Sequence, residues 1–175
     1  MDTQEQVAPG TIVLIGPMGV GKTSIGRSLA AMLSTDFYDI DIEIESEFGV
    51  TGSSIAGSRG VEYLHRVELD IFENLARSAG GGVIACAESV VDGPTGRRIL
   101  GLTQSVWLYA TPEDLAVRRL TSDHRRTVSA QEASALRATR DPHLAECTQL
   151  RVDTSSMSVH ECAEHIRHWL IEQGI

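Results

Sequence analysis

The 175-residue chain is poor in cysteine and in positive charge, and it has no long apolar run. No stretch approaches the roughly 20 consecutive apolar residues of a membrane-spanning helix. A net charge of −9 at pH 7 argues against a nucleic-acid partner, which needs a basic stripe to displace counterions from phosphates. Cys86, Cys147 and Cys162 lack C-x-x-C spacing, which indicates neither a disulfide framework nor a zinc site. We expect reduced, mostly buried thiols.

The organisation of the chain is predicted to be simple. Its length fits one domain over residues 1–175, with a flexible tail over about residues 1–9. The first six residues are acidic and polar, where a signal peptide would be basic and then apolar, so we expect a cytoplasmic protein without a membrane partner. Residues 121–130 are polar and aperiodic, which favours a mobile loop between helices. A monomer or weak dimer is expected.

One motif dominates the sequence. Residues 16–23 match the pattern G-x-x-x-x-G-K-[ST], between a β-branched run at 11–15 and an amphipathic stretch at 24–33. Glycines let successive N–H groups turn towards an anion, and the helix N-terminus adds its positive dipole end. Lys22 would then reach the β and γ phosphates of ATP, and Thr23 would ligate Mg²⁺. The predicted ATP-binding residues here are Gly16, Met18, Gly19, Val20, Gly21, Lys22, Thr23 and Ser24. A glycine-rich turn without a ligand is the alternative.

Short strands alternate with helices along the rest of the chain. The predicted strands lie at 11–15, 36–39, 83–87, 105–109 and 149–153, and the predicted helices at 24–33, 41–45, 61–76, 131–147 and 158–171, with a further helix starting at 111–114. This alternation implies an α/β fold with a parallel sheet covered on both faces. Residues 80–82 are three glycines before a strand, so they are interpreted as a turn at the sheet edge away from the phosphate loop.

The order of the motifs resembles the shikimate kinase family over nearly the whole chain. After the phosphate loop come Asp39-x-Asp41, then Gly60-x-Glu62 with Arg66-Val67-Glu68, then Arg118-Arg119 and a polar loop that carries arginines. The resemblance implies a three-layer P-loop kinase fold with a five-stranded parallel sheet in the order 2-3-1-4-5 and helices on both faces. It also implies transfer of the γ-phosphate of ATP, with Mg²⁺, to a hydroxyl of a small cyclic acid.

The same resemblance assigns roles to the two aspartates. Asp39 would hold the metal through water, together with Thr23. Asp41 would bind the acceptor hydroxyl and take its proton, and with Lys22 it would belong to the catalytic group. This suits phosphoryl transfer, which needs positioning and charge neutralisation more than a strong base. Helix N-terminal capping is the alternative role for both aspartates.

Roles for several arginines also follow from the resemblance. Arg119 would stack on adenine, unless it forms a surface salt bridge. Arg126 would be the catalytic lid arginine that closes over the phosphate, although Arg125 is an alternative because the family's Arg-Pro-Leu-Leu is replaced here by Arg-Thr-Val-Ser at 126–129. Arg140 would grip the acceptor carboxylate, for which a guanidinium is well suited.

The acceptor side departs from the family at two places. His65 stands where the family has a second carboxylate-binding arginine, and a mostly neutral imidazole lacks the planar fork. Residues 87–89 read Ala-Glu-Ser where the family has three glycines. Glu88 would repel an anionic acceptor and favour an amine or a polyol hydroxyl. Alternatively, it turns to solvent or pairs with Arg140. His65, Glu88, Arg140 and Asp41 are the predicted acceptor-binding residues.

These patterns predict an ATP-dependent phosphotransferase that acts on a hydroxyl of a small cyclic or polyol metabolite other than shikimate. A nucleotide-binding protein with a decayed acceptor site is an alternative, and so is a true shikimate kinase with an atypical pocket. Both aspartates are present, which disfavours the decayed protein. A nucleoside monophosphate kinase is disfavoured because no base-binding insertion is found.

Overall fold

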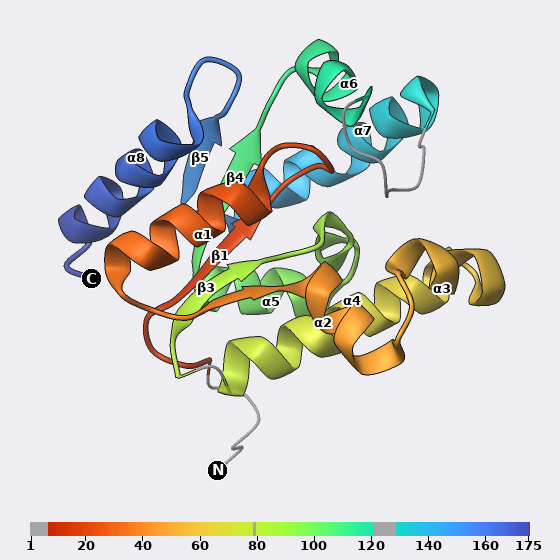
Figure 1. The fold of residues 1–175 in the computed structure, drawn as a ribbon, viewed down its shortest axis with the longest axis horizontal. Helices are drawn as coiled ribbons and strands as arrows, with labels where there is room; N and C mark the ends of the chain where they lie inside the picture. The colour runs from red at the N-terminus through yellow and green to blue at the C-terminus, as the bar shows by residue number, and fades with distance from the viewer. Residues whose placement is uncertain (1–6, 79, 121–128) are drawn as a thin grey trace.

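The described residues form five strands and eight α-helices. The computed structural model describes residues 7–78, 80–120 and 129–175 (Figure 1). The strands are β1 (Thr11–Ile15), β2 (Phe37–Asp39), β3 (Gly82–Ala85), β4 (Gln104–Tyr109) and β5 (Leu150–Asp153). The helices are α1 (Lys22–Leu33), α2 (Ile40–Phe48), α3 (Gly52–Arg59), α4 (Val61–Ser78), α5 (Pro94–Leu102), α6 (Pro112–Leu120), α7 (Ala130–Cys147) and α8 (Val159–Glu172), with a 3₁₀ helix, η1 (Glu88–Asp92).

The strands form one parallel sheet in the order β2-β3-β1-β4-β5, which confirms the predicted fold class. The central strand β1 pairs with β3 on one side and β4 on the other. The order of the strands reverses next to β1, and ligands of open α/β sheets bind at such a point, outside the carboxyl ends of the strands. The phosphate loop begins directly after β1, so it lies at this edge.

Two hydrophobic layers cover the sheet, because successive residues of each strand point to opposite faces. Ile12 and Leu14 of β1 pack with α1, α6 and α8, whereas Val13 and Ile15 pack with α2 to α5 and α7. In Figure 1, α1 and α8 lie together on one side of the sheet, and α4 and α5 lie on the other. The sheet is therefore the middle of three layers.

Some local features were not predicted. The sequence pattern missed α3 and η1. Gly80 and Gly81 precede β3 and Gly82 begins it, so these glycines lie at the edge opposite the phosphate loop, as expected. Of the predicted N-terminal tail, Ala8 is described, and its N–H donates to the Ala76 carbonyl at 2.8 Å. No described helix has the length and apolar character needed to cross a bilayer.

Candidate active site

The phosphate loop needs glycine at two positions, at one for a close approach and at the other for its backbone conformation. Gly16 has φ +153°, and a Cβ there would lie 2.2 Å from the Leu108 carbonyl oxygen. Gly21 has φ +105° and forms the N-cap of α1, a conformation that side chains rarely adopt. Lys22 begins α1, and its Nζ donates to the carbonyls of Gly16 at 2.7 Å and Pro17 at 3.2 Å. The ammonium group is thus folded back over the loop that would hold a phosphate.

Thr23 and Asp39 are brought together from two elements. The Thr23 hydroxyl donates to Asp39 Oδ2 at 2.6 Å, across the start of α1 and the end of β2. Asp39 is buried, and its Oδ1 accepts the N–H of Asp41 at 3.0 Å, which caps α2. Asp39 is therefore a helix cap and a neighbour of the threonine at once. The hydroxyl oxygen of Thr23 and the carboxylate oxygens of Asp39 are hard donors, and such donors suit Mg²⁺.

A cavity of about 320 Å³ adjoins the phosphate loop. It is lined by residues of the loop, of α1, of α6 and of the segment from β5 into α8: Gly19, Val20, Gly21, Ser24, Ile25, Arg118, Thr154, Met157, Ser158, Val159 and Cys162. Arg118 Nη1 donates to Thr154 Oγ1 at 2.9 Å, and its Nη2 donates to the Thr154 carbonyl at 2.8 Å. The position of the cavity next to the phosphate loop fits the nucleoside part of a bound nucleotide.

Arg118 is a cavity residue that sequence reasoning missed. The predicted adenine-stacking residue was its neighbour Arg119, whose side chain lies outside the described part of the structure. Arg125 and Arg126, the two candidates for the lid arginine, also lie outside the described residues. The only sequence signal for Arg118 was its place in the same arginine pair. The predicted roles of Arg119, Arg125 and Arg126 stay predictions.

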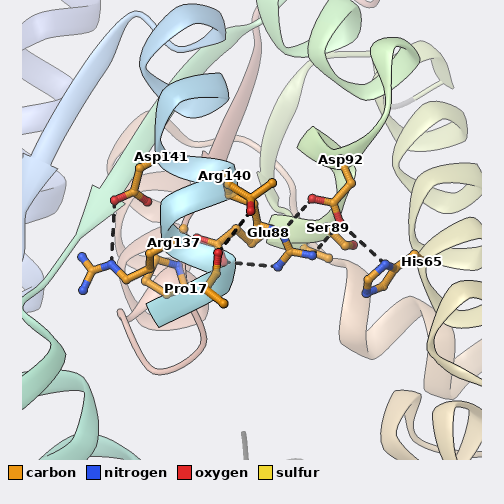
Figure 2. Close-up of polar contacts among 12 residues, drawn as sticks. Pro17, His65, Glu88, Ser89, Asp92, Arg137, Arg140 and Asp141 are labelled. Atoms are coloured by element: carbon orange, nitrogen blue, oxygen red, sulfur yellow. Dashed lines mark hydrogen bonds and ion pairs between the residues drawn. The ribbon is translucent and has the colours of Figure 1, made fainter. Parts of the chain in front are cut away.

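The acceptor side is built around Arg140, which is buried in α7. Its Nε donates to Asp92 Oδ1 at 2.8 Å and its Nη2 donates to Asp92 Oδ2 at 2.6 Å. Its Nη1 lies 3.5 Å from Glu88 Oε2. On the far side of Asp92, His65 Nδ1 lies 3.6 Å from Oδ2. Figure 2 shows Arg140 with Glu88 and Asp92 around its guanidinium, and His65 beyond Asp92. Asp92 was not singled out from the sequence.

Glu88 is partly buried, with its side chain 12% exposed, and it pairs with Arg140, which is one of the arrangements that the sequence left open. Its Oε1 is buried and has no hydrogen-bond partner among the described residues. Burial raises the pKa of Glu88, while Lys22 and then Arg140 act to lower it. Burial acts to lower the pKa of Arg140, but the hydrogen bond and charge of Asp92, followed by Glu88, raise it overall. The guanidinium is held as a cation by carboxylates of the chain itself.

Another buried carboxylate, Glu68, lies within electrostatic reach of both Arg140 and Asp41. Glu68 lies in α4 and accepts a hydrogen bond from the Ser89 hydroxyl. Burial, opposed by the hydrogen bond from Ser89 and aided by the charge of Asp41, raises the pKa of Glu68 from the usual 4.5 to about 7. Glu68 therefore exchanges its proton near neutral pH. The sequence analysis gave Glu68 no role beyond its place in the Arg66-Val67-Glu68 motif, because nothing in the sequence places Ser89 beside it.

The predicted acceptor residues are thus only partly grouped. Glu88 and Arg140 contact each other, and His65 approaches the group through Asp92. Asp41 is exposed in the first turn of α2, and its charge acts on Glu68. The site thus has hydroxyl and carboxylate oxygens beside the phosphate loop, and an acceptor side with more carboxylates than cations.

Known proteins resemble this chain throughout its length. The family model described as shikimate kinase matches residues 18–171. The chain is 36% identical to a shikimate kinase of Symbiobacterium thermophilum and 31% identical to one of Moorella thermoacetica, each comparison covering 93% of this chain and 97% of the relative. A shikimate kinase from Acinetobacter baumannii, solved in complex with shikimate, superposes with a TM-score of 0.86 at 28% identity, covering 98% of this chain and 97% of that one.

Proposed function

Since the chain belongs to the shikimate kinase family, and is an ATP-dependent phosphotransferase that acts on a hydroxyl group, we propose that its acceptor is a small cyclic or polyol metabolite other than shikimate. The predicted family and enzyme class are confirmed. The identity of the acceptor and the roles of single residues belong to the proposal.

The chain's own residues divide the work on the ATP side. Lys22 neutralises the β and γ phosphates once it leaves the carbonyls of Gly16 and Pro17. Thr23 and Asp39, whose side chains contact each other, would hold Mg²⁺. When bound, this ion would supply charge neutralisation at the transferring phosphate. The cavity beside Arg118 would receive the nucleoside.

Asp41 is the proposed partner of the acceptor hydroxyl. It stands two residues after Asp39, in the first turn of α2, so the metal-holding aspartate also fixes its backbone through the cap. Asp41 would orient the hydroxyl and accept its proton as the phosphoryl group is transferred. Arg126, or Arg125, would close over the phosphate and exclude water.

The observation that carries the acceptor proposal is the state of Arg140. An arginine that is to bind an acceptor carboxylate must offer free N–H groups in a planar fork. Here Asp92 and Glu88 already contact the guanidinium. A carboxylate-bearing acceptor would add another negative charge to this group and would meet repulsion. A neutral polyol or an amine would not.

The decisive test compares acceptors at equal concentrations. The relatives are named shikimate kinases, so shikimate is the first acceptor to measure, beside cyclitols, sugars and amino sugars. ADP release from Mg²⁺–ATP would be followed in a coupled assay, and phosphorylated product would be identified by mass spectrometry. We expect kcat/KM for shikimate to lie at least about a hundredfold below the usual lower range of about 10⁴ M⁻¹s⁻¹, and a better acceptor among the uncharged or amino compounds.

Two results would overturn the proposal. Shikimate turnover within the ordinary range would make the chain a true shikimate kinase with an atypical pocket. A rise in melting temperature with Mg²⁺–ATP, with no acceptor phosphorylated anywhere in the panel, would instead support the nucleotide-binding alternative. An Asp41→Asn variant is the control for catalysis, because it should bind ATP as the wild type does and transfer no phosphate above background.

We also propose that the enzyme works in the cytoplasm as a monomer or weak dimer. The support for the location is its thiols, all three of which are free and buried, as is usual in a reducing compartment. Light scattering coupled to gel filtration would test the oligomeric state, and fractionation of the source cells would test the location.

A further inference from the structure

Asp92 meets Arg140 with both carboxylate oxygens. The distances of 2.8 Å to Nε and 2.6 Å to Nη2 describe a two-bond pairing along one edge of the guanidinium. This is the arrangement in which an arginine binds a carboxylate most strongly and most specifically. The remaining contact, from Nη1, goes to Glu88 at 3.5 Å. The edge of Arg140 best suited to a ligand carboxylate is thus filled by a side chain.

Asp92 is also placed at the accessible side of the pair. Its side chain is 38% exposed, whereas that of Arg140 is 7% exposed. A solute carboxylate that approaches Arg140 from solvent would meet Asp92 before it met the guanidinium. His65 lies 3.6 Å from the same carboxylate, on the other side. Asp92 therefore lies between the two positions, 65 and 140, at which the family resemblance expects carboxylate-binding arginines.

The backbone helps to hold Asp92 there. It is the last residue of η1, and Gly93 and Pro94 follow it into α5. Arg97, one turn into α5, donates to the Val91 carbonyl at 2.6 Å, which ties the end of η1 to the helix that follows. A carboxylate fixed in this way loses little conformational freedom when it pairs, so a free carboxylate competes with it at a disadvantage.

We infer that Asp92 is a built-in carboxylate which fills the Arg140 fork and excludes acceptors that carry their own carboxylate at that position. This rests on the proposed function, because it explains why the acceptor would differ from shikimate. Asp92 acts as a specificity-determining residue. Its removal should open an anion site that the family's fold already contains, and the acceptor class of the unaltered enzyme is one without a carboxylate.

The test measures equilibrium binding in place of turnover. Shikimate would be titrated into the protein with Mg²⁺–ADP by isothermal calorimetry, for the wild type and for Asp92→Ser and Asp92→Asn. We expect the Kd for shikimate to fall at least about tenfold in Asp92→Ser, since a charge-assisted pair with Arg140 becomes available. Shikimate methyl ester, which lacks the charge, should gain less than about twofold, as expected for a probe that cannot form this pair.

Two controls tie the gain to this pair. Asp70→Asn removes the same charge from an exposed position of α4 and should leave the Kd unchanged. The double variant Asp92→Ser with Arg140→Gln should lose the gain. Asp92→Asn keeps the size of the side chain and serves where Asp92→Ser lowers the melting temperature strongly. A folded Asp92 variant that binds Mg²⁺–ADP normally, yet binds shikimate no better than the wild type, overturns the inference.

This outcome is separable from failure of the proposed function. Ordinary turnover of shikimate by the wild type would overturn the proposed function, and the comparison of Kd values would still decide whether Asp92 competes with a carboxylate. Conversely, the wild type and the Asp92 variants could all fail to bind shikimate. The proposed function would then stand, but Asp92 would not be the residue that excludes shikimate.

Discussion

Asp39 combines two contacts that a single substitution can separate. Its Oδ1 caps α2 and its Oδ2 accepts the Thr23 hydroxyl. In Asp39→Asn an oxygen still caps the helix, so the free energy of unfolding should change by no more than about 1 kcal/mol. The lost charge should weaken Mg²⁺-dependent phosphotransfer by about 10- to 100-fold. Urea unfolding and initial rates over a Mg²⁺ titration would measure the two effects.

Asp36→Asn is the matched control, because Asp36 is an exposed aspartate three residues earlier. It should change neither quantity. If Asp39→Asn kept the wild-type rate at every Mg²⁺ concentration, the proposed metal role of Asp39 would be wrong and only the capping role would remain.

Glu68 makes stability depend on pH. Its pKa is raised from 4.5 to about 7 by burial, so between these values the folded chain keeps a proton that the unfolded chain releases. Stability therefore falls as pH rises through this window. Glu68→Gln removes the effect, so its free energy of unfolding relative to wild type should increase by about 2 kcal/mol between pH 5.5 and pH 8.

Urea unfolding of both proteins at the two pH values would measure this change. Glu45→Gln, an exposed carboxylate in α2, should show the same difference from wild type at both. A gap between Glu68→Gln and wild type that stays constant with pH would mean that Glu68 is ionised throughout the range.

At the scale of elements, packing around α5 decides whether replacing a glycine by alanine destabilises or stabilises the protein. A Cβ on Gly96 would lie 1.9 Å from the Val90 carbonyl oxygen, while a Cβ on Gly101 would meet open space. Gly96→Ala should therefore push η1 away from α5 and cost at least about 2 kcal/mol. Gly101→Ala should stabilise the helix by up to about 1 kcal/mol.

The two variants share one helix and one chemical change, so each is the control for the other in urea unfolding. Since η1 carries Glu88 and Asp92, Gly96→Ala should also disturb the Arg140 cluster. Equal effects on unfolding from the two substitutions would contradict the close contact between α5 and η1.

Elements with a strong period were predictable, and those made by packing were not. The apolar spacing of α4 and the β-branched run of β1 both indicated the observed structure. In contrast, α3 contains several glycines and serines and buries only Ile55, so it has no pattern to detect. Its start depends on the Thr51 cap.

In the candidate site, too, one part was predictable from the sequence and another was not. Lys22 and Thr23 belong to a contiguous motif, so the phosphate edge could be read from the sequence. Asp92 and Arg140 are 48 positions apart and meet only because α7 packs against η1. No spacing rule connects them, which is why the family resemblance indicated Arg140 as a carboxylate-binding residue and gave no sign of Asp92.

At the scale of the whole molecule, the fold encloses three thiols in different ways. Cys86 and Cys162 are almost fully buried at 0% and 1% exposure, while Cys147, at the end of α7, is 8% exposed. Burial raises the pKa of all three. A thiol reagent therefore reports openings of the structure, local for Cys147 and more extensive for the other two.

We expect Ellman's reagent to label Cys147 first in the native protein and to label Cys86 and Cys162 only as the whole molecule unfolds. Mg²⁺–ATP at about 100 times its Kd adds about 2.7 kcal/mol of stability, so it should slow those two thiols about a hundredfold and Cys147 much less. Mass spectrometry of the labelled peptides would separate the sites, and protein unfolded in guanidinium, in which all three react together, is the control. Rapid native labelling of Cys162 would instead show that the wall of the cavity beside Arg118 opens on its own, because Cys162 lines that cavity.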